Sequence, residues 1–246
     1  MQAGGTTMRA LFSSRIWLKT PSIQCTAGVK SFTPPKSFTD IEYPERKKLK
    51  VMLKVPQYPP SISPFTMQKK LKLMRGPELY HNTLLHKQYG IIATAGGRVK
   101  YNHMEVIRYT LLRTVFAQNK DAFAIWRIPG PWQPISQRSL GSRLGGGKAD
   151  IKFYVTPVKA GQVLVEVGGP FEYFEVKKVL ADIANKMPFA ARAVSQEILD
   201  TIAARKKQIE VENQNPFTWK YIIQNNMLGC HRWISKYDRR WFNEYM

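Results

Sequence analysis

The stretch SRLGGGKADIKFYVTPVKAGQVLVEVGG, residues 142–169, contains two runs in which apolar residues recur at every second position. These runs are IKFYVTPV (151–158) and QVLVEV (162–167), and the short connection between them includes Gly161. Such alternation is typical of half-buried β-strands, and a short glycine-containing turn favours pairing of its flanking strands as an antiparallel hairpin. The sequence therefore predicts that the two runs pair with each other, with Glu166 on the open face of the sheet.

A basic, glycine-rich loop precedes the first run. Residues 138–150 read RSLGSRLGGGKAD and hold four glycines and three cations before their only acid, Asp150. Glycine lets a backbone approach a ligand closely and adopt positive φ, and exposed amides beside Arg and Lys suit phosphate groups. We predict a flexible finger that contacts a phosphate-rich partner. A solvated loop without a ligand is the alternative.

The loop does not match a nucleotide-binding P-loop. That motif needs a glycine five positions before the glycine of its Gly-Lys pair, and a Ser or Thr directly after the pair. Around Gly147 and Lys148, those two positions hold Ser142 and Ala149. The first glycine and the magnesium-binding hydroxyl are therefore both missing, which argues against an ATPase.

The charge of the chain indicates a polyanionic partner. Lys and Arg number 38 against 17 Asp and Glu, which gives a net charge of +21 over 246 residues. A fold with this charge repels itself unless a polyanion neutralises it, and nucleic acid ranks before an anionic membrane surface as the candidate. The two cysteines and four histidines lack the spacing of a disulfide framework or metal site, and no run of 18 apolar residues predicts a membrane span. We predict no cofactor and no stable membrane insertion.

Residues 89–194 form the predicted globular domain. Strand patterns occur at 89–97 and 122–128, and a short edge strand is predicted at 189–194. With two helices, these elements predict an α+β fold. Its antiparallel or mixed sheet carries two amphipathic helices packed on one face, as a two-layer sandwich.

Apolar residues at helical spacing predict the two helices. Asn102 is the predicted N-cap of the first, with Glu105 in capping-box spacing, and the second covers residues 172–187. The predicted buried positions are Met104, Ile107, Leu111, Leu112 and Val115 in the first helix and Val176, Val179, Leu180, Ile183 and Met187 in the second. Arg108 and Arg113 fall outside the first stripe, so we expect them to face solvent or RNA.

Two segments precede this domain. Residues 1–39 contain no acid, several cations and abundant Ser and Thr, and residues 8–20 can form an amphipathic helix. These features are typical of a mitochondrial transit peptide; a disordered basic tail shares the composition but not the helix. Residues 40–88 combine prolines with basic clusters, which is typical of an extended arm that orders against its partner, or of a disordered linker.

Residues 195–246 follow the domain as a helical extension. Ser195 is predicted to cap a helix that reaches Glu212, and another helix is predicted to begin at Asn215-Pro216. The tail from 231 to 246 interleaves cations with aromatic residues. That pattern suits stacking on RNA bases and a protein interface equally.

Several motifs occur in the order found in one known family. The strongest is residues 142–169, where a Gly/Lys-rich loop, an aromatic strand, a Pro/Ala-Gly turn and a Val/Leu-Glu strand follow one another. Gly97-Arg98, Trp126-Arg127 and Lys186-Met187-Pro188 fit the same pattern. The segment from Gly90 to Val194 thus resembles the universal large-subunit ribosomal protein family called L-sixteen in bacteria. With its transit-like N-terminus and its extensions at both ends, the chain looks like the mitochondrial member.

The resemblance implies a non-enzymatic protein bound to large-subunit ribosomal RNA and to neighbouring proteins of the mitochondrial large subunit, in the matrix. It also implies that the glycine-rich loop points toward the aminoacyl-tRNA side of the peptidyl transferase centre. Gly146 stands where bacterial members usually carry Lys, and Ala149 where they usually carry Gly, so this loop is less charged and slightly stiffer. The expected RNA-binding residues are Arg98, Lys100, Arg108, Arg113, Arg127, Arg138, Arg143, Gly145, Gly146, Gly147 and Lys148.

Two other functions stay open at this point. An enzyme acting on RNA or nucleotides would use acids such as Asp150, Glu166 or Glu172, but no paired carboxylates, Ser-His-Asp order or Cys-His pair indicates a site. A peripheral membrane protein would be held by its basic arms. The charge balance and the family pattern favour RNA binding without chemistry.

Overall fold

The computed structural model describes residues 37–59, 61, 73–143, 145–147 and 149–245. All of them belong to one of the two compact units of the chain, Ser37–Met246. The predicted transit segment therefore lies outside the described residues, except for its last three positions.

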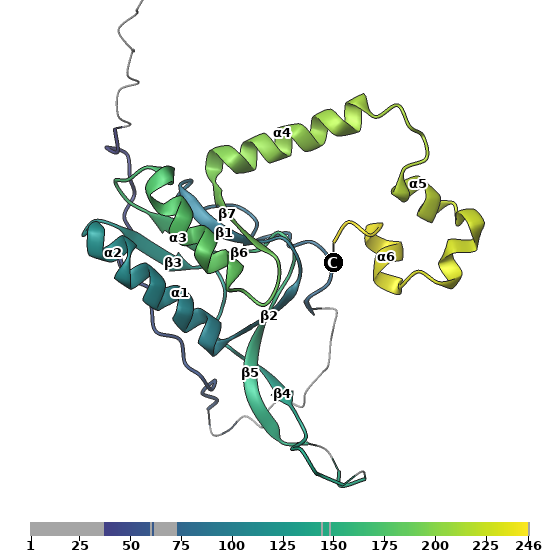
Figure 1. Ribbon diagram of the computed structural model, residues 1–246, viewed down its shortest axis with the longest axis horizontal. Coiled ribbons are helices and arrows are strands. Elements are labelled where there is room, and N and C mark those ends of the chain that lie inside the picture. The colour runs from purple at the N-terminus through teal and green to yellow at the C-terminus, as the bar shows by residue number, and fades with distance from the viewer. Residues whose placement is uncertain (1–36, 60, 62–72, 144, 148, 246) are drawn as a thin grey trace, which may run out of the picture. The chain divides into compact units, whose positions relative to one another are not determined.

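The strands form two antiparallel sheets (Figure 1). The larger has the order β3-β6-β1-β7, and the smaller has the order β2-β5-β4. The strands of the larger sheet are β1 (Tyr89–Ala93), β3 (Phe123–Trp126), β6 (Val163–Gly168) and β7 (Ala191–Ser195); those of the smaller are β2 (Gly97–Lys100), β4 (Gln133–Ser136) and β5 (Ile151–Val158). The strand predicted at 189–194 is thus present as β7, at the edge of the larger sheet.

The predicted pairing of residues 151–158 with residues 162–167 is wrong. β5 pairs with β2 and β4, whereas β6 pairs with β1 and β3. At the turn between them, Gly161 adopts φ +85° and its N–H donates to Ala93 O at 2.7 Å, while Ala93 N–H donates to Gln162 O at 2.9 Å. These bonds tie the turn to the end of β1, so the chain crosses from one sheet to the other instead of folding back on itself.

Two helices cover one face of the larger sheet, as predicted (Figure 1). They are α1 (Tyr101–Arg113) and α3 (Tyr173–Asn185); the short α2 (Val115–Gln118) follows a break at Thr114. Met104, Ile107, Leu111 and Val115 are buried from the first stripe, and Val176, Leu180, Ile183 and Met187 from the second. Leu112 is wrong as a core residue, because its side chain is 38% exposed. The predicted α+β class is confirmed, with two sheets in place of one.

The predicted N-cap of α1 is also wrong. The helix begins at Tyr101, so Lys100 is the N-cap, and its N–H donates to Nδ1 of His103 at 3.1 Å. Burial, followed by the charge of Lys100, lowers the pKa of His103, which keeps the ring neutral and able to accept this bond. Glu105 does not close a capping box and instead pairs with Arg108.

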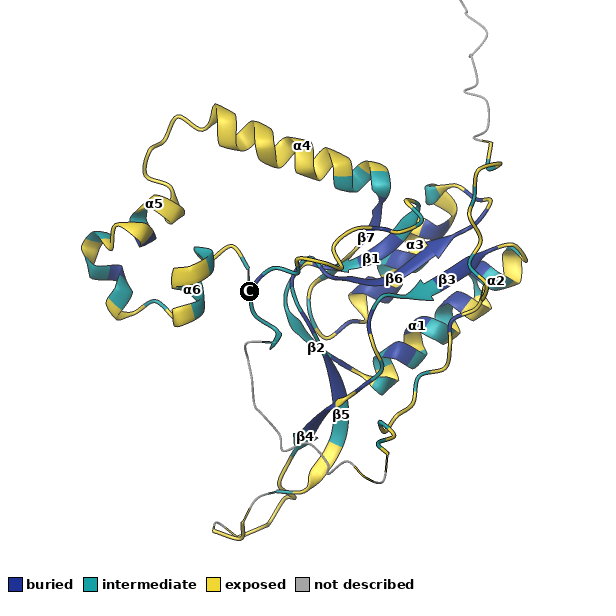
Figure 2. Cartoon of the chain, turned by 180° about the vertical axis from the view of Figure 1, so that it is seen from behind, coloured by how far each residue is buried: buried dark blue, intermediate teal, exposed yellow. Residues whose placement is uncertain are grey.

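The other face of the larger sheet is covered by the segment that precedes β1. Ala124 N–H donates to Lys47 O at 2.9 Å, and Val163 N–H donates to His81 O at 2.9 Å. Leu49 and Leu84 are buried against the sheet, and Figure 2 shows its strands largely dark blue. Residues 47–49 and 81–84 of the predicted arm 40–88 therefore pack on the domain itself.

The extension after β7 starts as predicted. Ser195 caps α4 (Gln196–Glu212), its Oγ accepting from Ile198 N–H at 3.3 Å. The next helix, α5 (Trp219–Gln224), begins after Thr218, later than the predicted Asn215-Pro216. A 3-10 helix, η2 (Met227–Arg232), and α6 (Lys236–Trp241) complete the extension. Among all described residues, no helix is long and apolar enough to cross a membrane.

Candidate nucleic-acid interface

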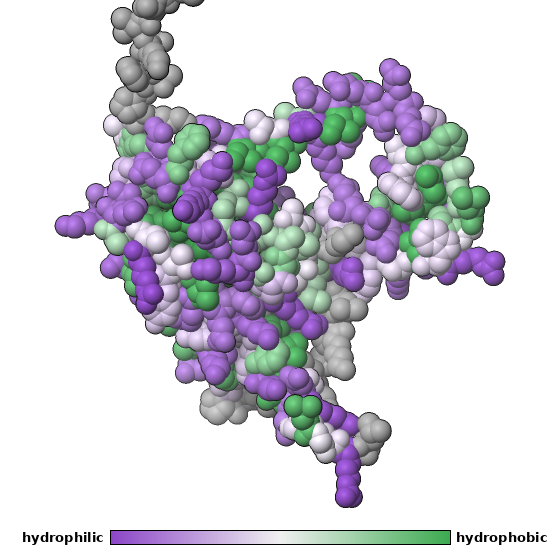
Figure 3. All heavy atoms as spheres, in the orientation of Figure 1, coloured by the Kyte–Doolittle hydropathy of each residue, from purple (hydrophilic) through white to green (hydrophobic). Residues whose placement is uncertain are grey.

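The glycine-rich loop lies at the tip of the β4–β5 hairpin, which extends away from the helices (Figure 1). Gln133 pairs with Val155 and Ser136 with Ile151, so the sheet holds the base of the hairpin in a fixed register. Strand β4 was missed in the sequence, because the proline-rich stretch before it indicated a break. Every described residue from Gln137 to Gly147 is exposed, and Figure 3 shows hydrophilic side chains at this tip. We call residues 137–150 the finger.

Three positions of the finger require glycine because of their backbone conformation. Gly141, Gly145 and Gly147 adopt φ of +84°, +89° and +84°, where other L-residues are strained. A Cβ at these positions would meet nothing within 4 Å, so space is not the constraint. Gly147 N–H donates to Gly145 O at 2.8 Å, which closes a tight turn at the tip.

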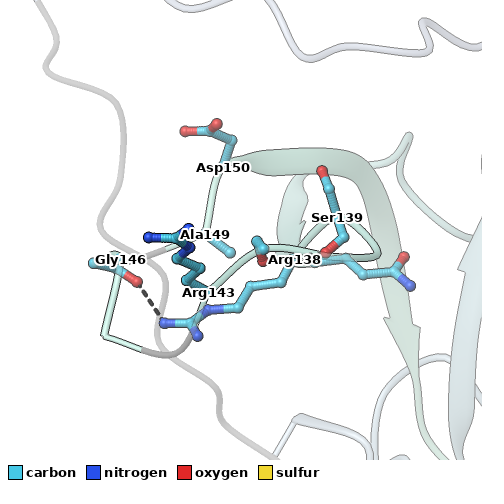
Figure 4. A pocket seen from close by; sticks show the side chains of 9 residues that line it. Arg138, Ser139, Arg143, Gly146, Ala149 and Asp150 are labelled. Atoms are coloured by element: carbon cyan, nitrogen blue, oxygen red, sulfur yellow. Dashed lines mark hydrogen bonds between the residues drawn. The ribbon is translucent and has the colours of Figure 1, made fainter.

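The finger folds around a shallow pocket of about 260 Å³ (Figure 4). Arg138 reaches across the loop and donates from Nη2 to Gly147 O at 2.8 Å, the dashed line of Figure 4. Ser142 Oγ donates to Ser139 O at 3.1 Å. An Arg side chain has five N–H donors, so this arrangement positions Arg138 and leaves most of its donors facing outward. The two serine hydroxyls were not predicted, although Ser recurs within the loop sequence.

The electrostatic character of the finger is basic with one acid at its base. Arg138 and Arg143 are exposed on the loop, and Lys152 is exposed at the start of β5. Asp150 is exposed as well, and it lines the pocket. Lys148, the third cation expected here, lies outside the described residues. Lys152 was missed because it falls in a strand pattern, where alternate polar residues are ordinary.

Two predicted cations lie on β2, in the same sheet as the finger. Arg98 stands opposite Pro157 of β5, and its Nε is buried without a hydrogen-bond partner within the described part of the chain. Lys100 Nζ lies 4.4 Å from the ring centroid of Phe153, a cation–π contact that holds it beside β5. The Arg98 side chain is only partly buried, so its other guanidinium N–H groups can serve an acceptor such as a phosphate oxygen.

The two arginines of α1 are placed apart from the finger. Arg108 donates to both carboxylate oxygens of Glu105, at 3.1 and 2.7 Å, and stacks 4.3 Å over the ring of Tyr109. The hydrogen bond to Glu105 raises the pKa of Arg108, and its side chain is only 18% exposed. Arg113 is exposed at the opposite end of α1 from β2. The structure therefore brings Arg98 and Lys100 to the sheet of the finger, but not Arg108 or Arg113.

Arg127 has an internal partner. Its Nε lies 3.0 Å from Oε1 of Glu166, whose side chain is 2% exposed. Glu166 also accepts from Leu85 N–H at 2.9 Å and from His86 N–H at 3.3 Å. The prediction that Glu166 lies on an open face is wrong, because residues 84–86 cover that face. Since this ion pair occupies Arg127, we leave Arg127 out of the interface.

The acids considered for an enzymatic site are dispersed. Glu166 is in the ion pair, and Glu172 is the N-cap of α3, where its N–H donates to Oε1 of Glu175 at 2.9 Å. Asp150 has no second carboxylate beside it among the residues that line the pocket. No group of three or more His, Cys, Asp or Glu residues within the described ranges could hold a metal ion. The arrangement of the finger and β2 suits binding of an extended polyanion by cations and backbone amides.

Known proteins similar to this chain are described as proteins of the large ribosomal subunit. A 140-residue stretch of the chain is 29% identical to a protein of Francisella tularensis subsp. holarctica described as "Large ribosomal subunit protein uL16". It covers 57% of this chain and 98% of that relative. A protein of Agathobacter rectalis with the same description is 29% identical over 127 residues, which are 52% of this chain and 84% of the relative.

The family described as "Ribosomal protein L16p/L10e" matches residues 60–194. The match begins before β1 and ends within β7, so it contains both sheets apart from Ser195, together with α1, α3 and the finger. Because it spans more than half of the sequence, the chain belongs to the ribosomal protein L16p/L10e family.

Proposed function

We propose that this protein is a structural constituent of the mitochondrial large ribosomal subunit, where it binds large-subunit ribosomal RNA through the finger and the cations of β2. The observation that carries the proposal is the finger itself. It is an exposed, glycine-turned loop with two described arginines at its tip, held on a sheet that also places Arg98 and Lys100. Membership of a ribosomal protein family confirms the prediction that the chain is not an enzyme.

The described part of the finger has features that suit RNA phosphates. Cations neutralise phosphate charge and release counterions, and this supplies much of the affinity of such contacts. The serine hydroxyls and the glycine amides add donors that fit phosphate and 2′-hydroxyl groups. We propose Arg138, Arg143, Arg98 and Lys100 as the principal contacts, with Lys148 as a further contact predicted from the sequence.

The mitochondrial assignment rests on the N-terminal sequence. Residues 1–39 are free of acids and carry an amphipathic, arginine-bearing stretch that is typical of import signals. The relatives compared above are bacterial, and the family match, residues 60–194, does not include this stretch. Fusion of residues 1–39 to a fluorescent protein tests the assignment; we expect import into the matrix, and diffuse cytosolic fluorescence would refute it.

Within the subunit, we propose that the finger approaches the tRNA-accommodating region near the peptidyl transferase centre. This part of the proposal rests on the resemblance of residues 142–169 to the family pattern. The loop can extend toward such a region, because it lies at the end of a two-stranded hairpin rather than against the helices (Figure 1). Chemical probing of the large-subunit RNA with and without the Arg143→Glu change tests it, since altered reactivity should cluster around the transfer centre.

The first experiment is sedimentation of the tagged protein in mitochondrial lysate, with and without ribonuclease. We expect migration with the large subunit, which is lost when ribonuclease dismantles the particle. Migration as a free species in both conditions would refute the ribosomal assignment.

Variants in the finger then test the site. Arg143→Ala should lower incorporation only modestly, because one phosphate contact is a small part of the total, whereas Arg143→Glu adds repulsion and should lower it more. Lys178→Glu, which reverses an exposed cation on α3, is the matched control and should leave incorporation unchanged. Equal incorporation of Arg143→Glu and Lys178→Glu would show that the finger is not the binding centre.

A further inference from the structure

The C-terminal extension exposes large apolar side chains that nothing in the described chain covers. Helix α4 has no buried residue, and Ile202 and Ile209 on one side of it are 43% and 57% exposed. After α4, the exposed fractions are 56% for Phe217, 67% for Trp219 and 74% for Trp233. Figure 3 shows the apolar side chains gathered over α5 and η2. Scattered apolar residues on a surface are ordinary, but several aromatic residues in one short segment mark an interaction site.

The segment is also poor in charge. Residues 213–235, which we call the aromatic turn, contain Lys220 and Arg232 as their only charged residues, whereas charged residues make up 22% of the whole chain. The extension from 195 to 246 carries eight Lys and Arg against six Asp and Glu, so it holds little of the net charge of +21. The cationic character of the protein therefore resides elsewhere, and the aromatic turn contributes almost none of it.

The aromatic turn has an internal framework that keeps these side chains outward. Only Ile223 and Cys230 are buried within it. His231 Nε2 lies 2.7 Å from Ile223 O, and His231 N–H donates to Asn226 Oδ1 at 2.9 Å, which closes the turn between α5 and η2. Asn226 itself adopts φ +48°, a conformation that Asn tolerates better than most residues. The exposed aromatic residues are thus held by a preorganised turn, and preorganisation lowers the entropic cost of binding.

We propose that the aromatic turn docks onto another protein of the large ribosomal subunit, which receives Trp219 and Trp233 in apolar pockets with a largely uncharged surround. This inference deepens the proposed function and rests on it. Protein interfaces are enriched in Trp, Tyr and Phe and depleted of charge at their centres, as the aromatic turn is. An RNA-binding surface combines stacking aromatic residues with cations that lie along the RNA backbone. The 23 residues of the aromatic turn contain only two Lys or Arg residues.

One of the two cations has an aromatic partner within the extension. Lys220 Nζ lies 5.9 Å from the ring centroid of Phe242, the residue that follows α6. The family match ends at residue 194, which places the whole extension outside the region held in common with the family. In sequence, the aromatic turn thus lies outside the matched region, which contains the finger and β2.

The test is site-specific photo-crosslinking in cells that express the tagged full-length chain. A benzophenone amino acid replaces Trp219 or Trp233, one at a time, and replaces Ser139 in the finger as the reference position. After irradiation, the large-subunit fraction is isolated on a gradient, and each adduct is digested with ribonuclease or with protease. The gradient position tests the proposed function, and the chemistry of the adduct tests the inference.

Adducts at Trp219 and Trp233 that resist ribonuclease and contain one common protein, beside a ribonuclease-sensitive adduct at Ser139, support the inference. Ribonuclease-sensitive adducts at the two tryptophan positions overturn it, as does an adduct with a second copy of this chain. The absence of any adduct there, while Ser139 still reacts, overturns it as well. In addition, Trp233→Ala should weaken capture of the identified protein by roughly thirtyfold, the size of a Trp hot spot, and an unchanged affinity would exclude Trp233 from the interface.

Discussion

The ion pair between Arg127 and Glu166 offers a direct measurement of what holds the N-terminal segment on the sheet. Glu166 Oε1 lies 3.0 Å from Arg127 Nε, and the carboxylate also accepts from the amides of Leu85 and His86. The side chains of Arg127 and Glu166 are 13% and 2% exposed, so neither charge is well solvated. Glu166→Ala removes the only acid from this group and leaves a guanidinium and two amides without an acceptor.

The expected loss follows from these contacts. Removal of one partner of a buried ion pair destabilises a protein by about 3–5 kcal/mol, a range that includes the cost of the orphaned charge. Glu166→Gln keeps one acceptor oxygen for the amides, so we expect a loss of about 2 kcal/mol. Arg127→Met and Glu166→Met, made singly and together, form a double-mutant cycle. The double variant removes both charges, and the two positions should show a coupling energy of about 2 kcal/mol. A domain of ordinary stability has about 5–15 kcal/mol in total, so the single change is severe.

Urea unfolding of the purified full-length chain, followed by far-UV circular dichroism, measures the free energy of unfolding of each variant. Asp121→Ala, which breaks the exposed pair with Lys47 at 2.9 Å, is the matched control and should cost under about 1 kcal/mol. Limited trypsin digestion supplies a second reading, because release of residues 84–86 should speed cleavage after Lys87. Losses below about 1 kcal/mol for Glu166→Ala and Glu166→Gln, with additive effects of Arg127→Met and Glu166→Met in the double variant, would refute the reasoning.

Two further outcomes are expected. Burial lowers the pKa of His103, so its contribution to stability is complete above its unfolded pKa of about 6.5 and is lost as the pH falls through the lower folded value. A melting series from pH 8 to 5 should therefore show a steeper loss of stability for the natural protein than for His103→Gln. Parallel curves would contradict this expectation. Ser195→Ala removes the acceptor for Ile198 N–H at the start of α4 and should cost about 1 kcal/mol of helix stability; Thr201→Ala, a control within the helix, should have a smaller effect, and amide exchange in the first turn of α4 distinguishes the two.

The elements that could be predicted are those defined by their own local pattern. The stripes of α1 and α3 are buried as expected, apart from Leu112, because helical periodicity fixes which residues share a face. Ser195 caps its helix as expected, because a hydroxyl before a helical pattern has one strong local role. Strands β3, β5, β6 and β7 also occur where the sequence placed them.

Which elements pack or pair with one another could not be predicted from these local patterns. Alternation in β5 and β6 indicates strands, but it does not say which strand each pairs with, and the turn at Gly161 bonds to Ala93 instead of closing a hairpin. Glu166 and Arg127 each resembled an exposed residue, because the sequence does not show that residues 84–86, some 80 positions earlier, cover that face. Within the finger, the positive φ of three glycines follows from their type, whereas the reach of Arg138 to Gly147 O depends on the folded loop.

The order of the larger sheet also determines when the protein can fold. Its strand β1 lies between β6 and β7, so Tyr89 and Ile91 find both neighbours only in residues that come much later in the chain. A nascent chain therefore exposes β1 with two open edges until β6 has emerged, and with one open edge until β7 has emerged. Non-local pairing of this kind slows folding, and unpaired strand edges attract other chains. During biogenesis, the interval between the appearance of β1 and of β7 is thus the period in which a chaperone would protect this protein most.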